Sequence, residues 1–143
     1  MKKRTWVTVL IVMMVLSVSC FVFWRQGHIE HAKMADLCQG SICRSLESFK
    51  EYSVNGDDYL YTYGVAEFRS FMSAYLYLND NSSDPEYLDC NVIYGDMALN
   101  PQKVQANMQE IVEALAILAD DYTDPTGYIR LNELANLFRH AEE

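Results

Sequence analysis

Histidine and glycine are scarce in this sequence, and their scarcity limits the chemistry it can perform. The three histidines, His28, His31 and His140, lie near the two ends of the chain, which leaves little material for acid–base catalysis near neutral pH. The six glycines show no spacing that would cradle a phosphate, and no nucleophile stands beside a base and an orienting acid. We therefore expect a protein that is not an enzyme.

Basic residues are also in the minority, with 11 lysines and arginines against 20 acidic residues. Every acidic residue follows Arg25, together with only seven basic ones, so the chain beyond that point carries a formal charge near −13. A surface of this sign repels nucleic acid and anionic lipid headgroups, which excludes a nucleic-acid-binding function. An acidic surface can bind cations or a basic partner. It can equally serve only to keep the domain soluble.

The four cysteines include no C-x-x-C pair and the histidines are distant from them in sequence, so a zinc site is not expected. Cys20 falls within an apolar run, and three cysteines follow that run. On a helix, Cys38 and Cys43 would point in directions about 140° apart, so they would not bridge each other. Two alternatives stay open: a disulfide that joins Cys38 or Cys43 to Cys90, or three small buried thiols.

What the sequence does contain is an uncharged run of 19 residues from Trp6 to Trp24. A short basic segment precedes it, made of Lys2, Lys3 and Arg4. As a helix the run would span about 28 Å, close to the hydrocarbon thickness of a bilayer. Trp6 and Trp24 would lie at the two headgroup layers, and the basic N-terminus would stay in the cytoplasm. We expect a single-pass anchor in the lipid bilayer of the cell membrane, with the C-terminal domain outside.

Two other interpretations use the same residues. The small residues Ser17 and Ser19 suit a cleaved signal peptide, and Cys20 suits the end of a lipoprotein signal. The apolar run continues to Trp24, past either cleavage point, which favours the uncleaved anchor. The chain then divides into a cytoplasmic basic tail (1–5), a transmembrane anchor (6–24) and an acidic domain outside the cytoplasm (25–143).

Beyond the anchor, apolar residues recur at helical spacing and turn-forming residues separate the repeats. We expect the first helix to continue through Tyr52, a second helix over 57–78, and a short one over 85–95. An unbroken amphipathic helix is expected over 101–119, and a last helix after Pro125. The sequence therefore predicts an all-α fold: an N-terminal transmembrane helix followed by a small helical bundle of about four helices plus one short helix.

The segment 120–133 resembles a degenerate calcium-binding loop of the EF-hand type over one short stretch. Gly127 takes the place of the sharp turn, and Glu133 takes the place of the terminal bidentate ligand. With Asp120 at the first position the loop is 14 residues long, and Asp124 supplies a further oxygen. Because an aspartate before a proline is also a complete helix-start signal, a calcium- or ligand-binding domain is our second hypothesis for function.

Tyrosine is abundant, with ten residues, and one expected helix carries five of them: Tyr59, Tyr61, Tyr63, Tyr75 and Tyr77. These positions cannot all face one core, so some must be exposed, and exposed tyrosine suits protein recognition. We take Tyr59, Tyr63 and Tyr77 as the interface candidates. The first hypothesis is a non-enzymatic, membrane-anchored domain that binds another protein, such as a small subunit of a membrane assembly. A small enzyme outside the cytoplasm is the third.

Overall fold

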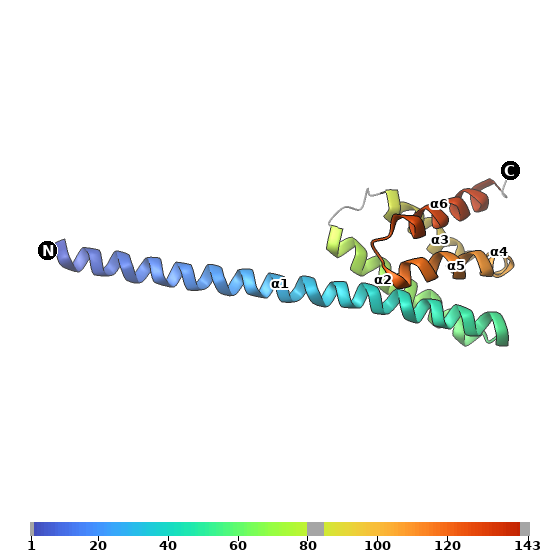
Figure 1. Ribbon diagram of the computed structural model, residues 1–143, viewed down its shortest axis with the longest axis horizontal. Coiled ribbons are helices and arrows are strands. Elements are labelled where there is room, and N and C mark those ends of the chain that lie inside the picture. Colours follow the sequence, from blue (N-terminus) through green and yellow to red (C-terminus); the bar gives the residue numbers. More distant parts are fainter. Residues whose placement is uncertain (1, 80–84, 141–143) are drawn as a thin grey trace. The chain divides into compact units, whose positions relative to one another are not determined.

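The computed structural model describes residues 2–79 and 85–140, and the regular elements among them are all helices, so the expected all-α class is confirmed (Figure 1). In chain order they are α1 (Lys2–Asn55), α2 (Asp58–Asn79), α3 (Pro85–Leu99), α4 (Pro101–Ala106), α5 (Met108–Asp120) and α6 (Pro125–His140). Contacts divide the chain into two units, Met1–Lys33 and Met34–Glu143. We call the second unit the helical domain and describe each unit by itself.

The first unit holds the part of α1 that contains the expected anchor. Within the described residues, α1 is the one helix long and apolar enough to cross a membrane, with a mean hydropathy of 1.7 over its most apolar 18 residues. Its most apolar stretch has no buried residue, and Trp6 and Trp24 are 71% and 62% exposed. An apolar helix that no protein surface covers is what a lipid-facing segment requires. The side chains of Lys2, Lys3 and Arg4 lie outside the described ones.

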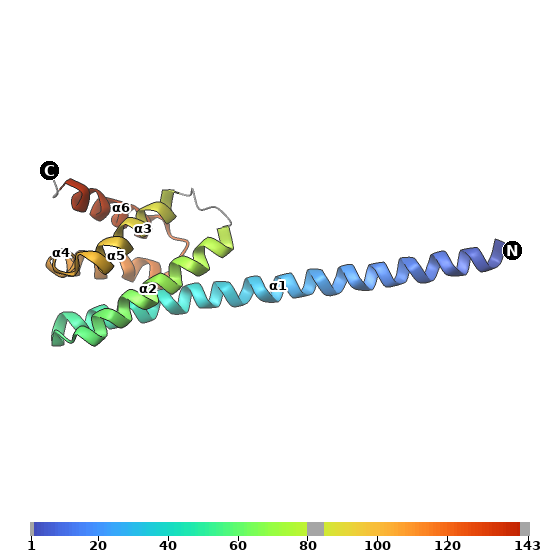
Figure 2. The same cartoon turned by 180° about the vertical axis from the view of Figure 1, so that it is seen from behind.

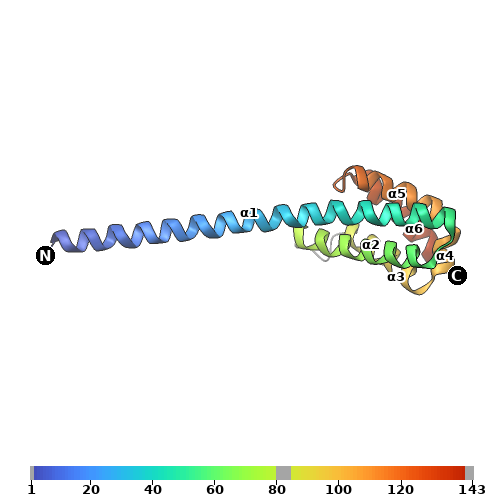
Figure 3. The same cartoon turned by 90° about the horizontal axis from the view of Figure 1, so that it is seen from below.

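In the helical domain, the last part of α1 and the returning helix α2 lie side by side (Figure 3). The turn between them is the one that the sequence indicates. Gly56 has a φ of 65°, a left-handed conformation that glycine adopts readily, and its N–H donates to the Tyr52 carbonyl at 2.8 Å. The Asp57 carboxylate then accepts the Tyr59 N–H at 2.9 Å and so caps the start of α2.

The core of the domain forms where α3 packs on α2 and α6, and where α6 also packs on α5 (Figure 2). A chain of aromatic rings crosses this core from α2 to α6. Ring centroids are 5.8 Å apart between Phe68 and Phe71, 6.1 Å between Phe71 and Tyr75, and 5.4 Å between Tyr75 and Tyr128. All four side chains are buried. Contacts of this kind add to the free energy gained by burying the rings.

The side chain of Gln39 joins α1 to the turn between α5 and α6. Its amide nitrogen donates to the Ala119 carbonyl, and its amide oxygen accepts the Tyr122 N–H at 3.3 Å. The Cys43 thiol, one turn further along α1, also lies 3.5 Å from the Ala119 carbonyl. Carbonyls at a helix C-terminus have no partner within the helix, so these side chains satisfy groups that would otherwise be costly to bury.

Two helix boundaries differ from the sequence-based expectation. The helix expected to end at Gly95 continues to Leu99, and the helix expected to be unbroken over 101–119 is interrupted at Asn107. Asn107 has φ −119° and ψ 27°, and its side-chain amide donates to the Lys103 carbonyl at 2.9 Å. Asparagine competes with the helical backbone for hydrogen bonds in this way, which explains the interruption. The buried positions are unchanged, because Val104 and Met108 on either side both face the core.

Candidate interaction surface

Small residues let α1 and α2 approach closely. Ser45 is fully buried on α1, and its hydroxyl donates to the Gly64 carbonyl of α2 at 2.9 Å. A Cβ atom on Gly64 would lie 2.8 Å from the buried ring of Phe49, so a larger residue would not fit without a shift. This close contact fixes which side of α2 faces α1, and it leaves another side of α2 exposed.

Arg44, Glu67 and Tyr63 form a polar cluster at the edge of this contact. Arg44 Nη2 lies 3.0 Å from Glu67 Oε2 and donates to Ser41 Oγ at 3.1 Å. Burial raises the pKa of Glu67, but hydrogen bonds from Arg44 and Tyr63 outweigh that effect, so the net pKa is lowered. The hydrogen bond to Glu67 raises the pKa of the Tyr63 phenol. Tyr63 therefore has a structural contact as well as an exposed ring.

The three tyrosines predicted as interface candidates are all exposed on α2, and we call them the tyrosine face. Tyr59 is 72% exposed, Tyr63 38% and Tyr77 53%. The rings of Tyr59 and Tyr63 are stacked, with centroids 6.3 Å apart and planes 13° apart. The other two tyrosines of the helix, Tyr61 and Tyr75, are buried. The 3.6-residue period of the helix thus divides its tyrosines between the core and the surface.

The two buried tyrosines of α2 hold it against α3. The Tyr61 hydroxyl donates to the Met97 carbonyl at 2.8 Å, and burial raises the pKa of Tyr61 to about 12. The Tyr75 hydroxyl donates to Glu86 Oε2 at 2.6 Å. These bonds give both phenols a structural role, so they do not belong to the tyrosine face.

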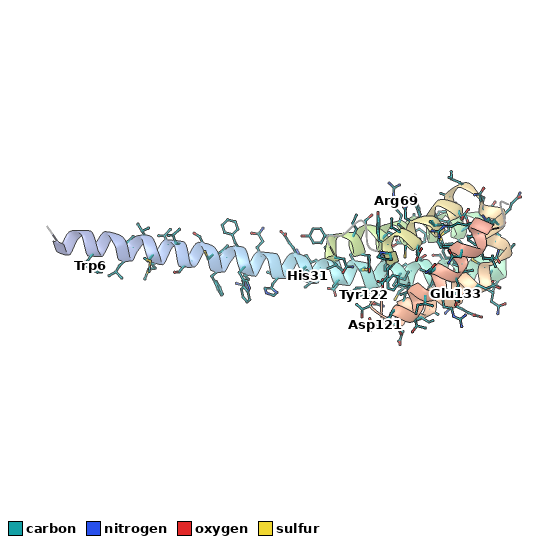
Figure 4. The ribbon with its side chains drawn as sticks, turned by 90° about the horizontal axis from the view of Figure 1, so that it is seen from above. Trp6, His31, Arg69, Asp121, Tyr122 and Glu133 are labelled. Atoms are coloured by element: carbon teal, nitrogen blue, oxygen red, sulfur yellow. The ribbon has the colours of Figure 1, made fainter. Side chains whose placement is uncertain are left out.

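An open groove lies between α2, α3 and α4, next to the contact of Tyr61 with Met97. Its volume is about 590 Å³, which is within the range of ligand-binding clefts. Tyr94 of α3 and Pro101 of α4 line it together with residues of α2. The guanidinium of Arg69 lies 6.0 Å from the centroid of the Tyr94 ring, and Figure 4 shows this arginine pointing out from the domain. No sequence pattern indicated this groove.

The predicted calcium ligands are placed apart and have other roles. The Asp124 carboxylate accepts the Thr126 N–H at 2.8 Å and so caps α6. Glu133 pairs with Arg130 at 3.3 Å on an exposed surface, and Asp120 is an exposed residue at the end of α5. In the parts of the chain that the structure describes, no three His, Cys, Asp or Glu side chains form a group that could hold a metal ion. This geometry gives the calcium hypothesis no support.

A disulfide from Cys38 or Cys43 to Cys90 was one of two alternatives for these cysteines, and this structure does not contain it. Cys38 and Cys43 are free cysteines, so among the described residues neither is bonded to Cys90. The Cys38 thiol lies 4.0 Å from the Phe71 carbonyl, and the Cys43 thiol lies against the α5 terminus. Burial raises the pKa of Cys38 to about 12, which keeps it in the unreactive thiol form. Small buried cysteine, the alternative interpretation, describes Cys38 and Cys90.

The fold and its surfaces define a class: a small all-α domain that follows a helix long and apolar enough to span a membrane. No protein-family model, no curated protein and no solved structure matches this chain. Its exposed face and its groove are therefore the basis on which a function can be assigned.

Proposed function

We propose that this protein is a non-enzymatic, membrane-anchored domain that binds another protein through the exposed side of α2. The observation that carries the proposal is the tyrosine face, in which Tyr59, Tyr63 and Tyr77 expose large aromatic rings along one helix. Tyrosine offers a rigid contact area with few rotatable bonds and one polar atom, and it is enriched at protein interfaces. A helix that served only as a spacer would gain nothing from exposing three such rings.

The charge of the chain supports a protein as the partner. Beyond Arg25 it carries 20 acidic and seven basic residues, and this excess of negative charge repels nucleic acid. A partner of this domain is therefore expected to have a neutral or basic contact surface. A partner with acidic contact residues would have to place them at one of the few basic side chains of the domain.

The anchor is proposed to place the N-terminus in the cytoplasm and the helical domain outside, because the basic residues before the apolar run outnumber the single Arg25 after it. Protease added to intact cells is expected to digest the helical domain and to spare an N-terminal tag. After the membrane is permeabilised, both should be digested. A helical domain that is protected in intact cells and digested only after permeabilisation would contradict this topology.

Crosslinking of the full-length protein in its native membranes tests the proposed binding. We expect one stoichiometric partner, and we expect its yield to fall about tenfold when Tyr59, Tyr63 and Tyr77 are changed to Ser, because interface tyrosines are frequent hot spots. A second variant changes only Tyr59 and Tyr77, so that the polar cluster of Arg44, Glu67 and Tyr63 stays unchanged.

The matched control changes Ile129 and Leu137 to Ser, since these α6 residues are 58% and 53% exposed and so expose a comparable apolar area. This control should retain the partner. The proposal is wrong if no specific partner is recovered, or if the tyrosine variants and the control retain it equally.

A further inference from the structure

Arg69 differs from the other arginines of the helical domain in having no carboxylate beside it. Arg44 lies 3.0 Å from Glu67, Arg130 lies 3.3 Å from Glu133, and Arg139 lies 3.7 Å from Asp89. Arg69 has no ion pair among the described residues, although acidic residues greatly outnumber basic ones in this part of the sequence. Its guanidinium instead lies over the ring of Tyr94. A guanidinium that contacts an aromatic ring and no carboxylate remains available to an anion from another molecule.

Arg69 lies at one end of the groove between α2, α3 and α4, and Asp58 lies at the other end of the α2 wall. Both line the groove, and they are eleven positions apart on the same helix, which corresponds to about 16 Å along its axis. The wall between them is apolar or small at Tyr61, Val65 and Ala66. The groove is therefore largely apolar and three turns long, with Thr62 and Gln105 as its uncharged polar residues, a carboxylate at one end and a guanidinium at the other.

We propose that this groove binds a helix of the partner protein, with an acidic residue in its first turn placed at Arg69 and a basic residue in its last turn placed at Asp58. The proposal rests on the protein-binding function proposed above and adds the chemistry of the partner segment. Its apolar stripe covers Val65, Ala66 and Pro101, as in other complexes where an amphipathic helix lies in a groove. The two charges fix its direction.

The direction follows from the charges and from the helix dipoles. An acidic residue is favourable in the first turn of a helix and a basic residue in the last turn, so the partner helix that matches Arg69 and Asp58 also stabilises itself. That helix runs antiparallel to α2, whose own first turn contains Asp58. Charged contacts of this kind set the register and orientation of a complex more than its total affinity. The proposal therefore predicts that the groove distinguishes a helix with an acidic first turn and a basic last turn from one with these charges exchanged.

The test uses two designed helical peptides of about 14 residues with the same leucine stripe. The first has Glu in its first turn and Lys in its last turn, and the second has these charges exchanged. Binding to the full-length protein in nanodiscs of uncharged lipid is measured by fluorescence anisotropy. We expect the first peptide to bind at least about fivefold more tightly, from two favourable contacts in place of two unfavourable ones.

The decisive variant carries Asp58→Lys and Arg69→Glu together, which leaves the net charge unchanged. It should favour the second peptide, and this reversal cannot come from a difference in helicity between the peptides, because the peptides are the same in both measurements. The control variant carries Glu47→Lys and Lys50→Glu, an exposed pair on α1 outside the groove, and it should keep the original preference.

Equal binding of both peptides to the unmodified protein, or the same preference in the Asp58 and Arg69 variant, would overturn the groove proposal. The peptide experiment tests the charges of the groove and needs no native partner. The crosslinking experiment tests the tyrosine face and leaves Asp58 and Arg69 unchanged. Failure of one proposal is therefore distinguishable from failure of the other.

Discussion

Replacing Phe71 with alanine is expected to remove a large part of the stability of the helical domain. Phe71 is fully buried, its ring contacts both Phe68 and Tyr75, and it lies in the middle of the aromatic chain that joins α2 to α6. Truncation of a buried phenylalanine costs about 3–5 kcal/mol from lost burial and from the cavity that remains. A domain of this size has only about 5–15 kcal/mol in total. Thermal unfolding of the Met34–Glu143 fragment, followed by circular dichroism, should show a midpoint lower by about 10–20 °C.

Leu99→Ala is the control for this experiment, because Leu99 is 80% exposed and its truncation creates no cavity. Its effect should stay within about 0.5 kcal/mol. If Phe71→Ala shifted the unfolding midpoint no more than Leu99→Ala does, the aromatic chain would not be the centre of the core.

Alanine at Gly127 and alanine at Gly95 are expected to change stability in opposite directions. A Cβ atom on Gly127 would lie 2.5 Å from Cγ of the buried Leu118, so α6 would have to move away from α5. Such overpacking costs about 1–3 kcal/mol, which exceeds the gain of up to about 1 kcal/mol from replacing glycine by alanine in a helix. A Cβ atom on Gly95 would have no neighbour within 4 Å, so that variant should gain about 0.5–1 kcal/mol.

Urea unfolding of the two variants beside the unmodified domain gives the sign of each change directly. The two substitutions are chemically identical and both lie in helices, so helix propensity is common to both. A stabilising Gly127→Ala would mean that α5 and α6 are not as close at this point as the structure has them. A destabilising Gly95→Ala would mean that α3 is more closely packed at Gly95 than the structure has it.

The helical periodicity of the sequence predicted much of this fold, because the buried side of each helix depends on the spacing of apolar residues within that helix. In the segment 101–119 the four- and three-residue spacing identified the buried side chains, and the interruption at Asn107 did not change which of them face inward. The same period indicated that the tyrosines of α2 could not share one face, and the structure divides them accordingly. The helix boundaries were less certain, because a single asparagine competes with the backbone by only one or two hydrogen bonds.

The features that the sequence did not reveal depend on contacts between distant segments. In the sequence, Gln39 is an ordinary polar residue of a helix. In the fold, its side chain forms hydrogen bonds with residues 80 and 83 positions later in the chain. The sequence alone indicates only that Arg69 and Asp58 are charged residues on one helix. They become the two ends of one groove because α3 and α4 pack beside α2. The likeness to a calcium loop arose because the aspartate that caps α6 also fits the spacing of a metal ligand.

The bond from Gln39 to the turn after α5 has a consequence for how the chain is made. A ribosome adds about 5–20 residues per second, so roughly 4–17 s separate the synthesis of Gln39 from that of Tyr122, 83 residues later. During this interval the side of α1 that carries Gln39, Cys43 and the buried residue Ile42 has no α5 to cover it. The nascent chain therefore exposes this side of α1 for several seconds before α5 exists. Chaperones and proteases that meet the nascent chain encounter this segment before the fold can protect it.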